Sequence, residues 1–165
     1  MKTSPIPCRL VFHFALLIIV SVPALLASQV QITWRGGVPG QEHNWNCPRN
    51  WSANRIPGEF DQVRLPDCSS RGSFYPILKT SAESSVQHLR IESGAELTLL
   101  PGAELIVDGE MTFASGILLF GSLQNDGRLE VRNSALDPFE VNGGEYLGKG
   151  KLVTDEASAS VERRK

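Results

Sequence analysis

Five acidic residues lie close together in the middle of the sequence: Glu92, Glu96, Glu104, Asp108 and Glu110. Two carboxyl groups about 5 to 10 Å apart across a cleft can hydrolyse a glycosidic bond. Glu96 and Glu104 each follow a Gly-Ala dipeptide, so we expect both to point outward in the same sense. Outward acidic residues also keep a folded surface soluble. We favour this solvated face over an enzyme that acts on polysaccharides.

The tryptophans form a second candidate site. All three, Trp34, Trp45 and Trp51, fall in the first third of the chain. Exposed side by side, they could stack on sugar rings, because an indole has a large amphipathic face. Buried, they could close the end of a stack of strands whose edges would otherwise pair with another chain. We favour the structural cap. The alternative is that the three tryptophans contact a ligand.

Other signatures of catalysis are missing. His43 and His88 do not form a pair at metal-ligand spacing, and no serine or glycine-rich loop matches a nucleophile or phosphate motif. Asn125-Asp126-Gly127 supplies only a fragment of the alternating Asp and Asn of a calcium loop. The net charge is −2 and the basic cluster 163–165 is terminal, which argues against nucleic acid as a partner. The sequence therefore predicts no catalytic residue, no cofactor and no metal site.

Cysteine usage agrees with export from the cell. Cys8 lies in the apolar N-terminal segment, which leaves Cys47 and Cys68, 21 residues apart. Two such cysteines in an exported protein favour one disulfide, which would stabilise the fold by about 3 kcal/mol in the chain-entropy view. Free thiols are the alternative, and a metal site would lack further ligands at a workable spacing.

The first 28 residues have the features of a secretory signal peptide. Lys2 and Arg9 accompany an apolar run over 10–22, which ends in proline and small residues. The run is shorter than the about 20 residues that cross a membrane. We therefore favour cleavage near Ala27 or Ser28 over a retained anchor. We expect a secreted, extracellular or cell-surface protein with no membrane span in its mature chain.

The elements that must position these residues are predicted to be short strands. Apolar residues recur in pairs with one residue between them, which places both members on one face of a strand. Gly-containing turns separate the pairs, and the turn at 93–97 is echoed at 101–105. Such repetition is typical of stacked architectures. The pairs are Leu89/Ile91, Leu97/Leu99, Leu105/Val107, Met111/Phe113, Ile117/Leu119, Leu129/Val131 and Phe139/Val141.

This rhythm predicts an all-β fold, namely a short right-handed parallel β-helix (β-solenoid) of about three to four coils, rather than an antiparallel meander. Coils of roughly 18 to 22 residues would stack the pair at 89/91 on 111/113 and then on 129/131. The predicted organisation is a signal peptide (1–28), a Trp- and Cys-containing cap (29–85), the coils (86–153) and a disordered tail (154–165).

Two stretches resemble a family of bacterial secreted and cell-surface proteins in which a Trp-rich segment precedes a right-handed parallel β-helix. The first stretch comprises Trp34, Asn44-Trp45, Asn50-Trp51-Ser52, Arg55-Ile56-Pro57-Gly58 and Asp61-Gln62-Val63 with Leu65-Pro66. The second, 88–109, is similar to the Gly-Ala coils that follow that segment. The motif at 50–55 is also similar to the β-helical ectodomain of the amnionless family. The resemblance implies surface placement and adhesive or structural roles, and it carries no catalytic residues.

Taken together, these patterns predict a non-catalytic secreted or cell-surface protein with an adhesive or structural role. One alternative is a carbohydrate-binding module with exposed tryptophans, and the least favoured is a polysaccharide-active enzyme. The expected partner is a polysaccharide or another surface protein, and the oligomeric state does not follow from the sequence. Asn50-Trp51-Ser52 also matches an N-glycosylation acceptor, although its place in a turn motif is a sufficient explanation.

Overall fold

The computed structural model describes residues 30–79, 83–109, 116–132 and 139–154. Within these residues the fold is all-β, and parallel strands stack into a β-solenoid. Helix is limited there to two single turns, η1 (Pro48–Asn50) and η2 (Ser69–Arg71). The predicted signal peptide, the tail from residue 155, Glu110 and the pair Met111/Phe113 lie outside the described residues.

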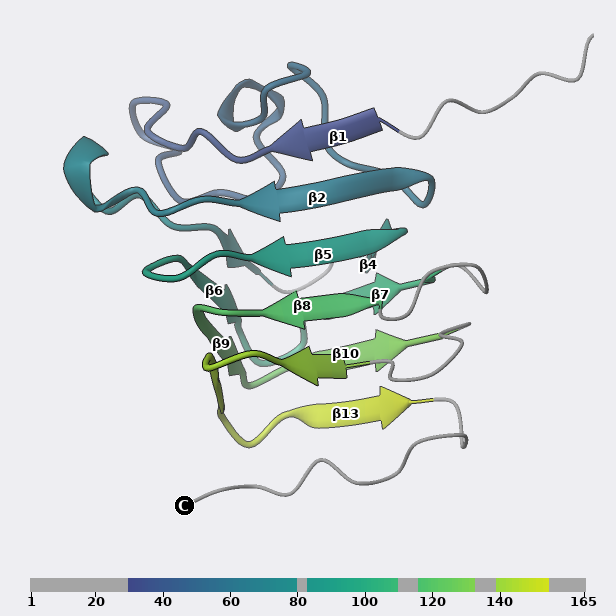
Figure 1. Cartoon of the computed structure of the whole chain (residues 1–165). Helices are drawn as coiled ribbons and strands as arrows, with labels where there is room; N and C mark the ends of the chain where they lie inside the picture. The colour runs from purple at the N-terminus through teal and green to yellow at the C-terminus, as the bar shows by residue number, and fades with distance from the viewer. Residues whose placement is uncertain (1–29, 80–82, 110–115, 133–138, 155–165) are drawn as a thin grey trace, which may run out of the picture.

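Three parallel sheets form the sides of the solenoid (Figure 1). The first sheet contains, in spatial order, β1 (Val30–Thr33), β2 (Asp61–Leu65), β5 (His88–Ile91), β8 (Ile117–Leu119) and β11 (Phe139–Val141). The second contains β3 (Ile77–Leu78), β6 (Glu96–Leu99), β9 (Ser122–Asn125) and β12 (Glu145–Leu147). The third contains β4 (Glu83–Val86), β7 (Glu104–Val107), β10 (Arg128–Val131) and β13 (Lys151–Thr154).

Each coil contributes one strand to each sheet. The coils are β2–β4, β5–β7, β8–β10 and β11–β13, and every strand pairs with its counterpart one coil away. For example, β5 pairs in parallel with β2 on one side and with β8 on the other. This pairing confirms the predicted stack of three to four coils and rules out the antiparallel meander for the described strands.

The predicted apolar pairs point into the core. Successive side chains of a strand face opposite sides, and β5, β8 and β10 bury every second residue accordingly. Because the strands are in register, these residues form columns along the solenoid. One column contains Ile32, Val63, Leu89, Ile117 and Phe139, all at most 3% exposed.

The register differs from the predicted one. Leu89 stacks on Ile117 rather than on residue 111, and Leu129 stacks on Leu105 in the third sheet. The prediction used coils of roughly 18 to 22 residues, whereas Leu89 and Ile117 are 28 residues apart, and the turns between strands differ in length from coil to coil.

The coils also begin earlier than the predicted boundary at residue 86, because β2, β3 and β4 already pair with the next coil. The alternation of apolar residues in these strands is weak in the sequence. β3 has only two residues, and β4 places Ser84 in register with the core residue Leu105.

Candidate functional site

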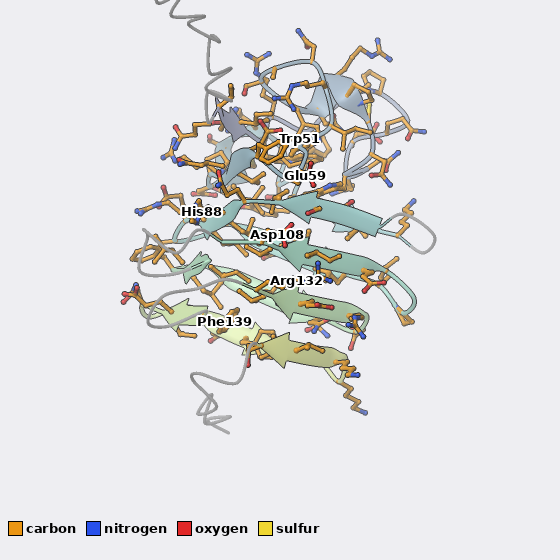
Figure 2. All side chains as sticks on the ribbon, turned by 90° about the vertical axis from the view of Figure 1, so that its right-hand side faces the viewer. Trp51, Glu59, His88, Asp108, Arg132 and Phe139 are labelled. Atoms are coloured by element: carbon orange, nitrogen blue, oxygen red, sulfur yellow. The ribbon has the colours of Figure 1, made fainter. Side chains whose placement is uncertain are left out.

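The three tryptophans lie inside the cap, not on its surface. Trp34, Trp45 and Trp51 are each 0% exposed, and the ring of Trp51 makes edge-to-face contacts with the other two at centroid distances of 4.8 and 4.7 Å. Figure 2 places Trp51 within the loop-rich region above the coils. A buried indole has no face on which a sugar ring can stack, so the alternative of tryptophan ligand contacts is wrong for this conformation.

Hydrogen bonds satisfy two of the three buried indoles, whereas the Nε1–H of Trp45 has no acceptor among the described residues. The Nε1–H of Trp51 donates to the carbonyl of Trp45 at 2.7 Å, and that of Trp34 donates to the carbonyl of Phe74 at 2.6 Å. A buried donor without a partner would cost about 1–3 kcal/mol. The tryptophans belong to the same core cluster as Ile32 and Leu65, so they close the N-terminal end of the solenoid core.

Asn50 organises the loops of the cap. Its side chain is 0% exposed, donates to the carbonyls of Gln41 and Asn44 at 2.6 and 3.1 Å, and accepts from the N–H of Val38 at 3.1 Å. The hydroxyl of Ser52 accepts from the N–H of Thr33. The glycosylation motif at 50–52 is therefore a structural element, because the amide that would carry a glycan is enclosed.

Cys47 and Cys68 are free, buried thiols, so the predicted disulfide is not formed. Each precedes a different helical turn, η1 or η2, and Cys68 has local partners. Its Sγ donates to the carbonyl of Pro66 at 3.5 Å and lies 3.6 Å from Nη2 of Arg71. Burial raises the pKa of the Cys68 thiol.

These thiols should be almost unreactive in the native protein. Cys47 is 8% exposed and Cys68 0%, and the raised pKa of Cys68 leaves that residue little thiolate. With a chromogenic disulfide reagent we expect slow labelling of the folded protein and rapid labelling of both residues in denaturant. Denatured, unreduced protein that shows no reactive thiol at either position would mean that a disulfide is present.

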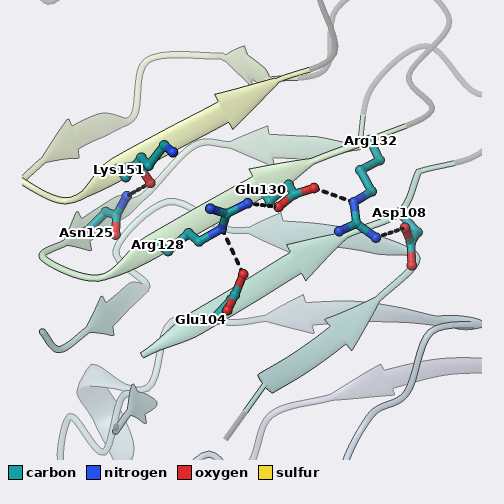
Figure 3. Close-up of polar contacts among 7 residues, drawn as sticks. All are labelled: Glu104, Asp108, Asn125, Arg128, Glu130, Arg132 and Lys151. Carbon is teal, nitrogen blue, oxygen red and sulfur yellow. Dashed lines mark hydrogen bonds and ion pairs between the residues drawn. The ribbon is translucent and has the colours of Figure 1, made fainter. Parts of the chain in front are cut away.

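Three of the acidic candidates are held in ion pairs on the outer faces of the sheets. On the third sheet, Glu104, Arg128, Glu130, Arg132 and Asp108 form a continuous chain of alternating charge (Figure 3). Arg128 lies 2.8 Å from Glu104, and Arg132 lies 3.7 Å from Asp108 and 2.5 Å from Glu130.

Glu92 occupies a similar position beside the first sheet. Arg64 and Arg90, which are in register on β2 and β5, each lie 2.9 Å from its Oε1. Hydrogen bonds from Arg90 and then Arg64 lower the pKa of Glu92. The guanidinium of Arg90 also lies 4.7 Å from the centre of the Phe120 ring. A carboxylate held by two guanidinium groups is a poor general base, so Glu92 is a structural residue.

These ion pairs predict a loss of stability in acid. The pKa of Glu130 is lowered from 4.5, first by the hydrogen bond from Arg132 and then by that from Arg128. A lowered pKa in the folded state gives stability that is present above the unfolded value and lost as the pH falls through the folded one. The urea concentration at the midpoint of unfolding should therefore stay constant near neutral pH and decrease when the pH drops below about 4.5. Glu130→Gln should flatten this fall, whereas Glu96→Gln, which breaks no described ion pair, should leave the profile unchanged.

Among the described residues, a hollow opens at the corner where the first sheet passes into the second. It has a volume of about 230 Å³ and is lined by Gly94, Ala95, Glu96, Phe120, Gly121, Ser122, Gly143 and Glu145. Its cause is a difference in turn length. Between the same stacked core positions the chain has five residues (92–96) on one coil, three (120–122) on the next and four (142–145) on the third. The short middle turn leaves a recess between two longer ones.

The chemistry of this corner groove is acidic and partly aromatic. Glu96, Ser122 and Glu145 occupy the same register position on three successive coils. The backbones of Glu96 and Glu145 are therefore separated by two strand spacings, about 9.6 Å. Neither carboxylate has a partner among the described residues, and Phe120 lines the same recess.

The sequence reasoning singled out Glu96 but missed Phe120, Ser122 and Glu145. Unequal turn lengths could have revealed the groove, but only once the register was known. The Nδ1–H of His43 donates a hydrogen bond to the carbonyl of Tyr75 at 2.8 Å, and the ring lies edge-on to Phe74, so His43 belongs to the cap. Within the described ranges no cluster of three or more His, Cys, Asp or Glu side chains could hold a metal ion. The same ranges contain no helix of the length and apolar character needed to span a membrane.

No protein-family model, curated protein sequence or solved structure matches the chain.

Proposed function

We propose that this protein is an exported, non-catalytic β-solenoid that acts as an adhesive or structural module at a cell surface. The observation that carries the proposal is the pairing of Glu92, Glu104 and Asp108 with arginines. Carboxylates that are neutralised in this way make a rigid, solvated face instead of an acid–base pair. The apolar N-terminal run and the resemblance to surface proteins with a Trp-rich segment support export.

Three measurements test this proposal. Expression of the full sequence in a secretory host should deliver protein to the medium or the cell surface, with an N-terminus near residue 28 or 29. Beads coated with this protein should adhere to extracellular matrix or cell walls. Incubation with a panel of polysaccharides should release neither reducing ends nor unsaturated products. Retention in the cytoplasm, failure to adhere, or release of either product would contradict the proposal.

The corner groove favours a second candidate function, the binding of a saccharide. Carboxylate oxygens accept hydrogen bonds from sugar hydroxyls, and an aromatic ring such as Phe120 packs against the apolar face of a sugar. The corner groove has a volume of about 230 Å³, which suits a small ligand. This site replaces the buried tryptophans as the place where a carbohydrate would bind.

A set of immobilised oligosaccharides, followed by calorimetry, tests the second candidate. We expect weak binding, which the double variant Glu96→Gln/Glu145→Gln should reduce by tenfold or more. The control is Glu59→Gln, an exposed residue just before β2, whereas the groove lies in the turns that follow β5 and β8. Equal binding by the double variant, or no binding by the unmodified protein, would eliminate the groove as a saccharide site.

A further inference from the structure

Asn142 and Gly143 lie in the turn between β11 and β12, and both residues are exposed. They form the one Asn-Gly pair of the sequence, since every other asparagine precedes a residue that has a side chain. Asparagine is a heat-labile residue, because the backbone nitrogen that follows it can attack its side-chain amide and close a ring. Glycine has no Cβ to hinder that attack. The sequence therefore has one position where this reaction meets the least resistance.

The fold leaves the attacking nitrogen of this pair free. The backbone N–H of Gly143 has no acceptor among the described residues. Its φ is +80°, and a Cβ at this position would meet nothing within 4 Å. The turn is held on both sides, by the hydrogen bond from the N–H of Asn142 to the carbonyl of Leu119 at 2.8 Å. The N–H of Glu145 donates in the same way to the carbonyl of Gly121 at 2.8 Å. Between these two anchors the nitrogen of Gly143 can move without breaking a hydrogen bond of its own.

Two Asp-Gly pairs of the same protein, Asp108-Gly109 and Asp126-Gly127, provide an internal comparison. An aspartate followed by glycine can close the same ring with loss of water. Here, however, the N–H of Gly109 donates to the carbonyl of Gln87 at 2.8 Å. The N–H of Gly127 donates to Oδ1 of Asn125 at 3.1 Å. Each nitrogen must give up a hydrogen bond before it can attack, so the fold distinguishes these two pairs from Asn142-Gly143.

We propose that Asn142 of the folded protein is a site of spontaneous covalent modification and converts to aspartate and isoaspartate, whereas Asp108 and Asp126 are protected. The nitrogen of Gly143 bonds to Cγ of Asn142, the bond from Cγ to Nδ2 breaks, and the proton of the Gly143 N–H passes through water to the ammonia that leaves. Water then opens the succinimide. Cleavage between the ring nitrogen and Cγ gives aspartate. Cleavage between the ring nitrogen and the backbone carbonyl carbon gives isoaspartate.

The modification places a new negative charge at the rim of the corner groove, which Gly143 and Glu145 line. In the unmodified protein, Nδ2 of Asn142 donates to Oε1 of Glu140 at 2.7 Å. The aspartate product has a carboxylate in place of this donor, so a hydrogen bond is replaced by repulsion between two carboxylates. In the isoaspartate product the backbone of the turn also becomes longer by one methylene group.

Prolonged incubation of the protein near neutral pH, followed by peptide mapping, tests this proposal. One sample is kept in buffer and another in denaturant, and an isoaspartate-specific methyltransferase quantifies the product at residues 108, 126 and 142. For each site, the rate in buffer is divided by the rate in denaturant. We expect this ratio to be about tenfold higher at residue 142 than at the other two sites, because their glycine nitrogens must first lose a hydrogen bond.

Two variants locate the reaction. Asn142→Gln, whose longer side chain closes the ring poorly, should lose the release of ammonia and the more acidic species that ion-exchange chromatography separates from the parent. The matched control is Asn54→Gln, an exposed asparagine followed by Arg55, which should age like the unmodified protein. Three results would overturn the proposal: no product at residue 142 in buffer while the denatured protein forms it, equal ratios at the three sites, or unchanged release of ammonia from Asn142→Gln.

Discussion

Trp51→Ala should destabilise the protein by about 4 kcal/mol, the usual range for removing a large buried aromatic side chain. Trp51 is 0% exposed and lies between the rings of Trp34 and Trp45. Its removal leaves a cavity at the closed end of the core and an unpaired carbonyl at Trp45. Urea unfolding followed by circular dichroism measures the change, because the β signal does not depend on the deleted indole.

Phe60→Ala is the matched control for this substitution. Phe60 also belongs to the cap but is 58% exposed, so its removal should change stability by no more than about 0.5 kcal/mol. If Trp51→Ala does not fold, Trp51→Phe keeps a ring and loses the hydrogen bond to Trp45, and a loss of about 2 kcal/mol is expected. A Trp51 variant as stable as the Phe60 variant would show that the cap is not part of the cooperative core.

Gly121→Ala should cost about 3 kcal/mol, a large effect for one methyl group. A Cβ at this position would lie 2.2 Å from the carbonyl oxygen of Ala95 and 2.3 Å from that of Glu92. Both atoms are backbone of the preceding coil, where the carbonyl of Ala95 accepts the N–H of Ser122 between coils and that of Glu92 accepts the N–H of Ala95 within its turn. The coils must therefore separate at this corner, which weakens β-pairing on both sides of it.

Gly58→Ala provides the comparison. The nearest atom to a Cβ at Gly58 is Oδ2 of Asp61 at 3.9 Å, an ordinary contact. This substitution should be neutral or slightly stabilising, because alanine reduces the freedom of the unfolded chain. Thermal unfolding of the two variants side by side gives the difference. Equal melting temperatures would mean that neighbouring coils are not in close contact at residue 121.

The strands could be predicted from the sequence because their signal is local. An inward pair such as Leu97 and Leu99 needs only the alternation of one strand, and the structure buries both residues. Register is not local, since it depends on how many residues each turn contains. The turn at 120–122 is two residues shorter than that at 92–96, and the turn at 126–128 is two residues shorter than that at 100–104, so the later coils shift relative to a regular repeat.

Residues that act across coils were the hardest to predict. Asn125 has the residue type of a turn, yet it is 0% exposed and donates to the hydroxyl of Tyr146. It also donates to the carbonyl of Lys151 on the next coil (Figure 3). Glu104 reads as a free acid, but its arginine partner lies on the following coil. The corner groove combines three coils, so its residues have no common signature in the chain.

The described stack is asymmetric, because the buried tryptophans close its core beside β2. Each coil pairs only with the coils next to it, so loss of order can spread one layer at a time from the last described coil without first disturbing the tryptophans. Thermal fraying of this protein should consequently be polarised, beginning at β13 and reaching β2 last. For the same reason we expect the first coil, whose core the tryptophans close, to form first. Each later coil can then pair with the one already formed.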